Sequence, residues 1–260
     1  VDNTFLSRAL AAGIFTAYES PLLADVPAEL RAAAAPDVTP IDYGDVCVNY
    51  DKAAFTGALP APATLDDLAD PRYAGMLVVE NPATSSPGLA FLLATIAAYG
   101  EDGWHDYWSR LVDNDVLVVD GWQEAYLTWF SGASAGDRSL VVSYATSPVA
   151  EVVFADPPVE EPPTGVVSEG CFRQVEYAGV LAGTDQPAAA RQLIDFMLGP
   201  AFQADVPLSM YVFPANATAS VPDVFAQHAA HVAAPLTLAP AQIDANRERW
   251  IDEWTEIVLR

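Results

Sequence analysis

Short apolar runs and segments of helical periodicity follow one another along the chain. The runs MLVV (76–79), VLVV (116–119) and LVV (140–142) have the length and composition of buried strands. Each is followed by a segment in which apolar residues recur at helical spacing. The stretch PIDYGDVCVNYD, residues 40–51, alternates and is rich in β-branched and aromatic residues, which predicts a further strand. Strands that alternate with helices predict an α/β fold.

Several helical patterns in the chain predict packing rather than chemistry. A short helix is expected at 3–15 and another after Thr64, whose hydroxyl can cap it. Apolar residues recur at i, i+3, i+4 and i+7 in Trp104, Tyr107, Trp108 and Leu111. An aromatic stripe of this kind is more typical of a core than of a ligand site. The C-terminal third is also predicted to be helical, with helical spacing of Ile243, Trp250, Trp254 and Ile257.

Polar or aromatic clusters follow the three buried runs, at 84–88, 120–124 and 144–148. In the first cluster Pro87 suits the first turn of a helix and Ser86 suits its cap. In the second, Asp120 is expected near a helix cap and Gly132 at the end of that helix. The carboxyl ends of strands in an open α/β sheet share one edge, where ligands bind. Helix N-termini also attract anionic or strongly polar groups, so the recurrence favours a binding site over three ordinary capped junctions.

Composition and charge exclude several classes of function. The 260 residues, 52% of them hydrophobic, are enough for one large domain or two lobes. The formal net charge of −24 with only 11 Lys and Arg argues against nucleic acid as a partner. No apolar run reaches the ~20 residues that span a bilayer, and the first residues lack the features of a signal peptide. The three His residues form no HExxH-like pattern, so no metal site is expected.

The chain has two cysteines, Cys47 and Cys171, in segments that both resemble strands. They could form one disulfide, which would be worth roughly 4 to 5 kcal/mol in the chain-entropy account of so long a loop. They could equally be two buried thiols that act as small hydrophobic residues. The residues alone leave both alternatives open.

Nine segments together resemble the thiamine-binding proteins of bacterial ABC importers. In chain order they are VDNTFLSRA, DYGDVCVNYDK, TLDDLADPRYAG, NPATSSPGLAFLL, GWQEAY, LVVSYATSP, EGCFRQVEYAG, ARQLIDFMLGPAFQADVP and RERWIDEW. TSSPG, GWQEAY and SYATSP in this order point to the thiamine branch, whereas DLADPRYAG and AFQ are shared by many solute-binding proteins. The resemblance implies a two-lobed periplasmic-binding-protein fold of type II with a ligand cleft between the lobes. Lobe 1 would comprise residues 1–46 and 171–260, and lobe 2 residues 47–170.

The family has about two further βα units before the segment that VDN begins here. These units carry an aromatic residue and an acidic loop of the cleft, so we expect lobe 1 to be incomplete in this chain. A signal or lipoprotein segment would be absent with them. The resemblance therefore implies an extracytoplasmic location, either periplasmic or as a cell-surface lipoprotein.

The resemblance also implies the ligand and its partners. The expected function is capture of thiamine, or of thiamine mono- or diphosphate, for the membrane permease of an ABC importer. We expect a monomer that is not an enzyme, needs no cofactor and binds no nucleic acid. Ring-stacking positions of the family match Trp122, Tyr144 and Tyr211. The position that holds the hydroxyethyl arm or its phosphate matches Ser85, with Thr84 and Ser86 beside it.

Two departures from the family and one weaker match qualify this assignment. Relatives carry a Trp at the position of Tyr211, and an aromatic residue where this chain has Ala150, which leaves the phosphorylation state of the ligand open. Tyr43 lies where a hinge strand of the family passes the cleft.

Cys47 and Cys171 lie on the two stretches that cross between lobes, so the resemblance implies a hinge disulfide in an exported protein.

Three alternatives remain at this point. The thiaminase fold resembles these proteins and uses a cysteine nucleophile, a role that Cys47 or Cys171 would have to fill. Related two-lobed proteins bind ferric ion through adjacent tyrosines, but Tyr144 is followed by Ala145. Others bind phosphonates or polyamines. A polyamine suits the acidic composition, whereas TSSPG at a helix N-terminus better suits an anionic arm.

Overall fold

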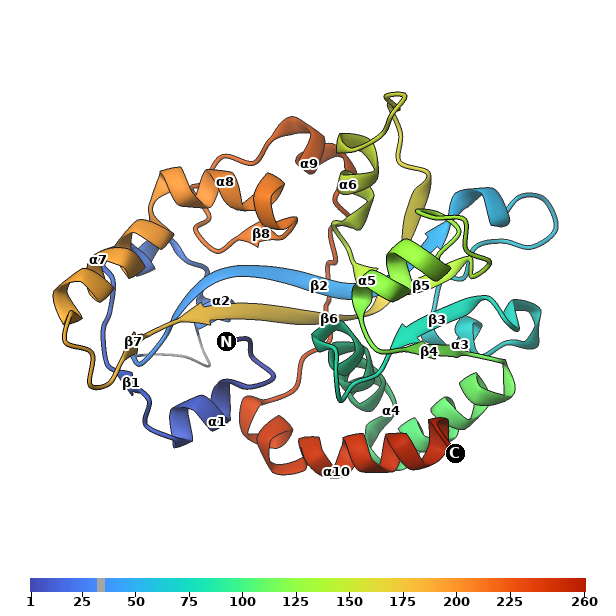
Figure 1. Cartoon of the computed structure of the whole chain (residues 1–260), viewed down its shortest axis with the longest axis horizontal. Coiled ribbons are helices and arrows are strands. Elements are labelled where there is room, and N and C mark those ends of the chain that lie inside the picture. Colours follow the sequence, from blue (N-terminus) through green and yellow to red (C-terminus); the bar gives the residue numbers. More distant parts are fainter. Residues whose placement is uncertain (32–35) are drawn as a thin grey trace. The chain divides into compact units, whose positions relative to one another are not determined.

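The computed structural model describes residues 1–31 and 36–260, which divide into two compact units (Figure 1). Unit 1 comprises residues 1–44, 174–227 and 239–245, and unit 2 comprises residues 45–173, 228–238 and 246–260. Two long strands, β2 (Thr39–Asp51) and β6 (Thr164–Ala178), have residues in both units. Both predicted lobe boundaries, at 46/47 and 170/171, fall within these strands.

The core of unit 2 is a sheet in the order β4-β3-β5-β2-β6. Strands β3 (Leu77–Glu80), β4 (Leu117–Val119) and β5 (Leu140–Tyr144) are mutually parallel, with β3 in the middle. Strand β5 is antiparallel to β2, and Val48 lies opposite Val142. The three parallel strands are the three apolar runs of the sequence, which confirms the α/β prediction.

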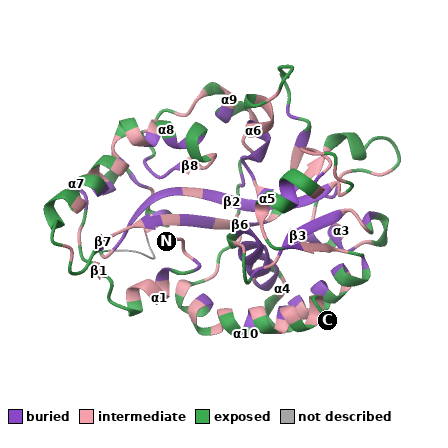
Figure 2. Cartoon of the chain, in the orientation of Figure 1, coloured by how far each residue is buried: buried purple, intermediate pink, exposed green. Residues whose placement is uncertain are grey.

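Helix α4 (Ser86–Asp113) contributes most of the helical core of unit 2. Its residues change direction at Gly100, where φ is 71° and ψ is 176°, so two helical patterns in the sequence form one kinked element. The predicted aromatic stripe is core, because Trp104, Tyr107 and Trp108 are fully buried. Figure 2 shows this buried helix beside the buried strands.

The C-terminal helix α10 (Pro240–Val258) departs from the predicted lobes. Residues 171–260 were all expected in lobe 1, yet 228–238 and 246–260 belong to unit 2. The physical reason is aromatic packing: Trp254 is fully buried and lies edge-on to Trp108 of α4, with ring centroids 5.4 Å apart. The apolar stripe of α10 was predicted correctly, but the helix on which it packs was not.

Smaller elements complete unit 2. The Thr64 hydroxyl accepts from Asp67 N and the Asp67 carboxylate accepts from Thr64 N, a capping box that confirms the predicted helix. The bounds of the smaller helices are η2 (Lys52–Ala54), α3 (Leu65–Leu68), η3 (Pro71–Tyr73), α5 (Trp122–Glu124), η4 (Ala125–Trp129) and α6 (Ser147–Val153). Between α6 and β6 lies a Pro-rich loop, PPVEEPP (157–163), whose residues are exposed apart from the buried Pro162.

Unit 1 is built from short elements around an apolar cluster that includes Leu6, Leu30, Ile41 and Leu198. Its helices are α1 (Leu6–Ala11), η1 (Pro21–Asp25), α2 (Ala28–Arg31), α7 (Pro187–Leu198), α8 (Pro200–Met210) and α9 (Asp223–His228). Strand β1 (Phe15–Thr16) pairs with β7 (Val180–Leu181), and β8 (Phe213–Pro214) pairs with β2. Helix α1 is shorter than the predicted 3–15, because Phe15 and Thr16 enter a strand.

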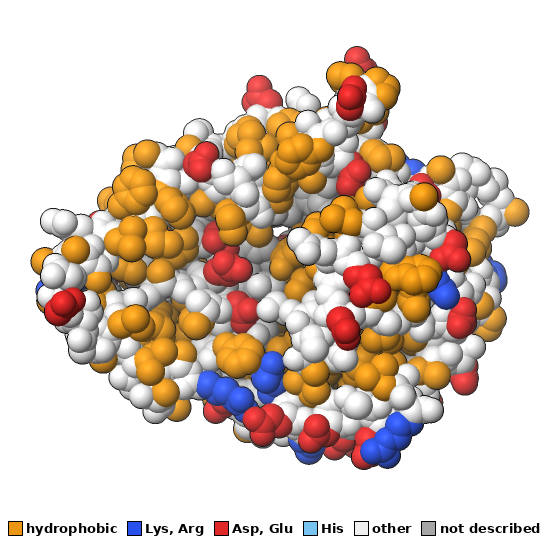
Figure 3. All heavy atoms as spheres, viewed as in Figure 1, with side chains coloured by type: hydrophobic (Ala, Val, Ile, Leu, Met, Phe, Trp, Pro, Cys, Tyr) orange, Lys and Arg blue, Asp and Glu red, His pale blue; other side chains and the backbone are white. Residues whose placement is uncertain are grey.

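The structure joins Cys47 of β2 and Cys171 of β6 in a disulfide within unit 2. Both residues are 1% exposed and pack with Ala145 and Val232. Within the described residues, no helix combines the length and the apolar character needed to cross a membrane. Figure 3 shows acidic side chains scattered over the viewed surface rather than gathered in one patch.

Candidate functional site

Side-chain hydrogen bonds connect the segments after β3 and β4 with the end of β5 in unit 2. Because the strands are parallel neighbours, their carboxyl ends lie at the same edge of the sheet. The hydroxyl of Thr84, in the first loop, donates to the carbonyl oxygen of Asp120, in the second, at 2.7 Å. The indole Nε1 of Trp122 then donates to the hydroxyl of Ser143, at the end of β5, at 2.8 Å. The three strand ends thus lie at one edge of the sheet, as the recurrence predicted, and binding of a ligand at this edge stays a prediction.

The helix caps at this edge differ from the predicted ones. Ser85, not Ser86, is the N-cap of α4: its backbone is extended, and its hydroxyl accepts from Gly88 N at 3.4 Å. Ser86 is the first helical residue, because the turn that follows Asn81 leaves Ser85 as the last extended position. Pro87 lies in the first turn, as predicted.

The second helix is also shorter than predicted. Its N-cap is Gly121 rather than Asp120, with no side-chain cap, and the Asp120 carbonyl oxygen receives the Thr84 hydroxyl. After three α-helical residues the chain widens into the π-helical turn η4, which ends at Trp129 rather than at Gly132. The prediction of a regular helix that ends at Gly132 was therefore wrong.

The aromatic residues predicted for unit 2 flank Ser143. Trp122 is half-buried, and its ring stacks on Tyr126 with centroids 4.9 Å apart and planes 19° apart. Tyr144 is half-buried at the end of β5, where its carbonyl oxygen accepts from Asn49 Nδ2 at 3.1 Å. Tyr144 follows Ser143 in the sequence, and Trp122 is hydrogen-bonded to Ser143. Both aromatic residues therefore lie at this edge of the sheet. In the α4 loop, Thr84 and Ser86 are exposed and Ser85 is half-buried.

A buried carboxyl group, missed by sequence reasoning, lies at the end of β3. Glu80 is 1% exposed, and neither oxygen has a hydrogen-bond partner in another described residue. Burial raises the pKa of Glu80 to about 8. The first turn of α4 packs directly on this strand end, since a Cβ on Gly88 would overlap the Glu80 carbonyl oxygen. The available signal was a lone acidic residue at the end of the apolar run VVE.

The predicted residues Tyr43 and Tyr211 belong to unit 1. Tyr43 of β2 stacks on Phe213 of β8, with centroids 5.3 Å apart and planes 19° apart. Tyr211 ends α8 in the left-handed region, with φ 54° and ψ 41°, and is half-buried. Burial first, and then the nearby Glu176 carboxylate, raise the pKa of Asp42 to about 7. Sequence reasoning did not single out Asp42, which lies within the strand pattern.

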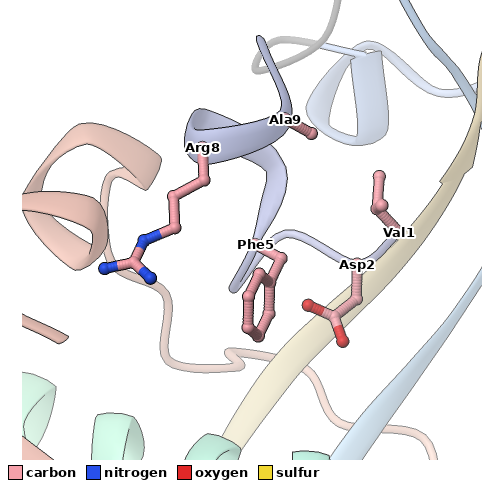
Figure 4. Close-up of a pocket in the computed structure, with 5 residues that line it drawn as sticks. All are labelled: Val1, Asp2, Phe5, Arg8 and Ala9. Atoms are coloured by element: carbon pink, nitrogen blue, oxygen red, sulfur yellow. The ribbon is translucent and has the colours of Figure 1, made fainter. Parts of the chain in front are cut away.

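Several surface hollows among the described residues lie elsewhere. One of about 440 Å³ in unit 1 is lined by Val1, Asp2, Phe5, Arg8 and Ala9 (Figure 4). Another of about 370 Å³ in unit 2 is lined by Ala83, Arg247, Glu248, Ile251 and Asp252. Neither hollow is lined by a predicted ligand residue. Within residues 1–31 and 36–260, no group of three or more His, Cys, Asp or Glu side chains could hold a metal ion.

Comparison with known proteins defines the class to which this fold belongs. Residues 1–233 match the family described as bacterial extracellular solute-binding protein, and the chain belongs to that family. Its architecture is the two-lobed α/β fold of periplasmic binding proteins. The chain has a TM-score of 0.83 and 29% identity with a solved periplasmic thiamin binding protein, covering 100% of this chain and 77% of that one.

Curated relatives point to one branch of this family. The chain is 32% identical over 260 residues to the thiamine-binding periplasmic protein of Escherichia coli strain K12, covering all of this chain and 75% of the relative. It is 33% identical over 221 residues to the protein of the same description from Salmonella typhimurium. That match covers 85% of this chain and 64% of the Salmonella protein, so the chain spans just under two thirds of this relative.

Proposed function

We propose that this protein captures thiamine, or thiamine mono- or diphosphate, and delivers it to the membrane permease of an ABC importer. The observation that carries the proposal is the connected edge of unit 2, where Thr84, Trp122 and Ser143 link three strand ends. This edge occurs in a chain that is similar throughout its length to a thiamine-binding periplasmic protein. The proposed location is extracytoplasmic, and the proposed state is a monomer.

The chemistry of this edge suits the three parts of thiamine. Trp122 and Tyr144 offer aromatic faces for the aminopyrimidine and for the thiazolium cation, whose attraction to a desolvated ring is worth ~1 to 2 kcal/mol. The N-terminus of α4, with Ser85 and Ser86, offers donors for the hydroxyethyl arm or its phosphate. Thr84 would act indirectly, because its hydroxyl is bonded to Asp120.

The assignment of Tyr43 and Tyr211 as further ligand contacts rests on the family resemblance. Tyr43 presents a ring already supported by Phe213. By that resemblance, Tyr211 stands at a position where relatives carry a Trp, and Ala150 at one where they carry another aromatic residue. This chain would then offer less aromatic surface than those relatives. We therefore propose that a phosphorylated thiamine, whose phosphate group reaches the N-terminus of α4, binds more tightly than free thiamine.

Isothermal titration calorimetry of the purified protein tests this proposal. Thiamine, thiamine monophosphate and thiamine diphosphate are the ligands, and spermidine, ferric citrate and a phosphonate are the comparison solutes. We expect saturable binding of at least one thiamine species and none of the comparison solutes. No heat from any thiamine species, combined with binding of a comparison solute, would refute the assignment of thiamine.

A thiaminase-like activity is the competing proposal. It needs an activated, accessible cysteine, whereas Cys47 and Cys171 are each 1% exposed and joined to each other. We therefore propose a binding function without catalysis and without a cofactor. Chromatographic analysis of thiamine after prolonged incubation with the protein should show no free thiazole, and its release would favour the enzyme.

A further inference from the structure

The buried hydroxyl groups of Ser143 and Ser147 accept hydrogen bonds from Trp122 and Tyr144, the two predicted aromatic ligand residues of unit 2. We propose that Ser143 and Ser147 are positioning residues for ligand binding, which fix the indole of Trp122 and the backbone of Tyr144. This inference rests on the proposed function and deepens it, because it names groups that set affinity without contacting the ligand.

The pair contacts both aromatic residues. Ser143 is 0% exposed and Ser147 is 6% exposed, and their hydroxyl oxygens are 2.7 Å apart. Ser143 accepts from Trp122 Nε1 at 2.8 Å, whereas Ser147 accepts from the backbone N–H of Tyr144 at 3.3 Å. A displacement of either hydroxyl would therefore change the hydrogen bonds of both Trp122 and Tyr144.

The donors and acceptors of this group fit one another. The indole N–H of Trp122 can only donate, so the Ser143 oxygen accepts from it. Either serine hydroxyl can donate to the other, because each hydroxyl oxygen can accept two hydrogen bonds. The Tyr126 hydroxyl, whose ring stacks on Trp122, donates to Glu151 Oε1 at 2.9 Å. The two buried serine hydroxyls are thus hydrogen-bonded to each other as well as to Trp122 and Tyr144.

This arrangement holds the Trp122 ring at two places. Ser143 fixes its edge, and Tyr126 covers one face at 4.9 Å between centroids. Tyr126 is itself held by the hydrogen bond from its hydroxyl to Glu151. A ring already ordered before binding avoids the loss of about 2- to 12-fold in affinity that immobilising a free side chain causes.

The core of unit 2 offers a matched control. Trp108 Nε1 donates to the hydroxyl of Thr95 at 2.9 Å, and both residues are fully buried in α4. This pair has the same chemistry as Trp122 and Ser143, but Trp108 is not a predicted ligand residue. Thr95→Val therefore removes the same kind of bond from the core.

The experiment compares Ser143→Ala, Ser147→Ala and Thr95→Val by calorimetric titration with thiamine. We expect Ser143→Ala to weaken binding by about 3- to 10-fold, the usual effect of one hydrogen bond. Thr95→Val should leave the dissociation constant within about 2-fold of the native value. In a Trp122→Phe background, Ser143→Ala should cause no further weakening, because the group it positions is gone.

Nuclear magnetic resonance of the indole N–H groups gives a second readout without ligand. The chain has six Trp residues, and the signal of Trp122 is the one lost in Trp122→Phe. Ser143→Ala should move this signal alone, and Thr95→Val should move that of Trp108. Ser147→Ala should weaken binding as well and also shift the Tyr144 amide, so it serves if Ser143→Ala fails to fold.

Each remaining outcome overturns the inference in a recognisable way. Native affinity in both serine variants would show that the hydroxyls do not act on binding. Equal weakening by Thr95→Val and Ser143→Ala would show a general effect of lost stability. If the native protein binds no thiamine species, the proposed function and this inference both fail. If the native protein binds thiamine and the serine variants bind it with the same affinity, only the inference fails.

Discussion

Glu80 should make the stability of unit 2 depend on pH. Its carboxyl group is 1% exposed, and burial raises its pKa from 4.5 to about 8. The folded protein therefore keeps the proton between these two pH values, whereas the unfolded chain releases it. The stabilisation is complete below pH 4.5 and is lost as pH rises through 8. Each pH unit in this interval should lower the free energy of unfolding by about 1.36 kcal/mol, or about 4 to 5 kcal/mol in all.

The variant Glu80→Gln isolates this contribution, because Gln has nearly the same shape and does not titrate. Its free energy of unfolding relative to native protein should rise steadily between pH 5 and 8. Burying the Gln amide has a cost that does not depend on pH, so it shifts the difference in free energy of unfolding equally at every pH. The change of this difference with pH, not its absolute value, therefore tests the protonation of Glu80. Asp42, Glu151 and Glu176 also have pKa values raised chiefly by burial, but their contributions are common to both proteins and cancel.

Urea denaturation at pH 5, 6, 7 and 8, followed by tryptophan fluorescence, provides the measurement. All six Trp residues belong to unit 2, so the signal reports on the unit that contains Glu80. Glu160→Gln, at an exposed position in the Pro-rich loop, is the matched control and should leave the slope unchanged. A stability difference between Glu80→Gln and native protein that stays constant from pH 5 to 8 would refute a protonated Glu80.

Three further predictions concern the site and its support. Trp122→Ala should weaken thiamine binding by more than about 1 kcal/mol in calorimetry, whereas Trp129→Ala, a half-buried neighbour, should not; loss of stability with native affinity would identify Trp122 as a core residue. Gly88→Ala should destabilise the protein by about 1 to 3 kcal/mol in denaturation, because its Cβ would overlap the Glu80 carbonyl oxygen; native stability would contradict this close approach. Intact mass should show two alkylated thiols only after reduction, and alkylation of Cys47 and Cys171 without reduction would argue against the disulfide.

The sequence predicted the features that depend on local pattern. The three apolar runs became the parallel strands, and the loops after them share one edge. The capping box at Thr64 was also recognisable, because both partners lie within one turn. The cap of α4 was misplaced by one residue, since Ser85 and Ser86 are equally good caps and the preceding turn decides between them.

Features that depend on distant contacts were not predictable from pattern. The apolar stripe of α10 gave no information on its partner, which proved to be Trp108 of α4. Ser143 has no distinctive sequence context, and its role emerges only because Trp122 lies beside it in the fold. Glu80 was visible as a charge at the end of an apolar run, but its burial depends on how closely α4 packs on β3.

The comparison between Trp122 and Trp108 shows where function can be inferred and where it cannot. Each indole donates to a buried hydroxyl, so the hydrogen bond alone does not mark a site. A buried hydroxyl without a partner would be costly, which explains the Thr95 pair as ordinary core satisfaction. Trp122 differs because it is only half-buried and begins helix α5 just after the end of β4. Its acceptor, Ser143, is also hydrogen-bonded to Ser147, which accepts from the backbone N–H of Tyr144. Core packing does not require a partly exposed ring to be fixed at both edge and face, whereas binding a flat cation does benefit from it.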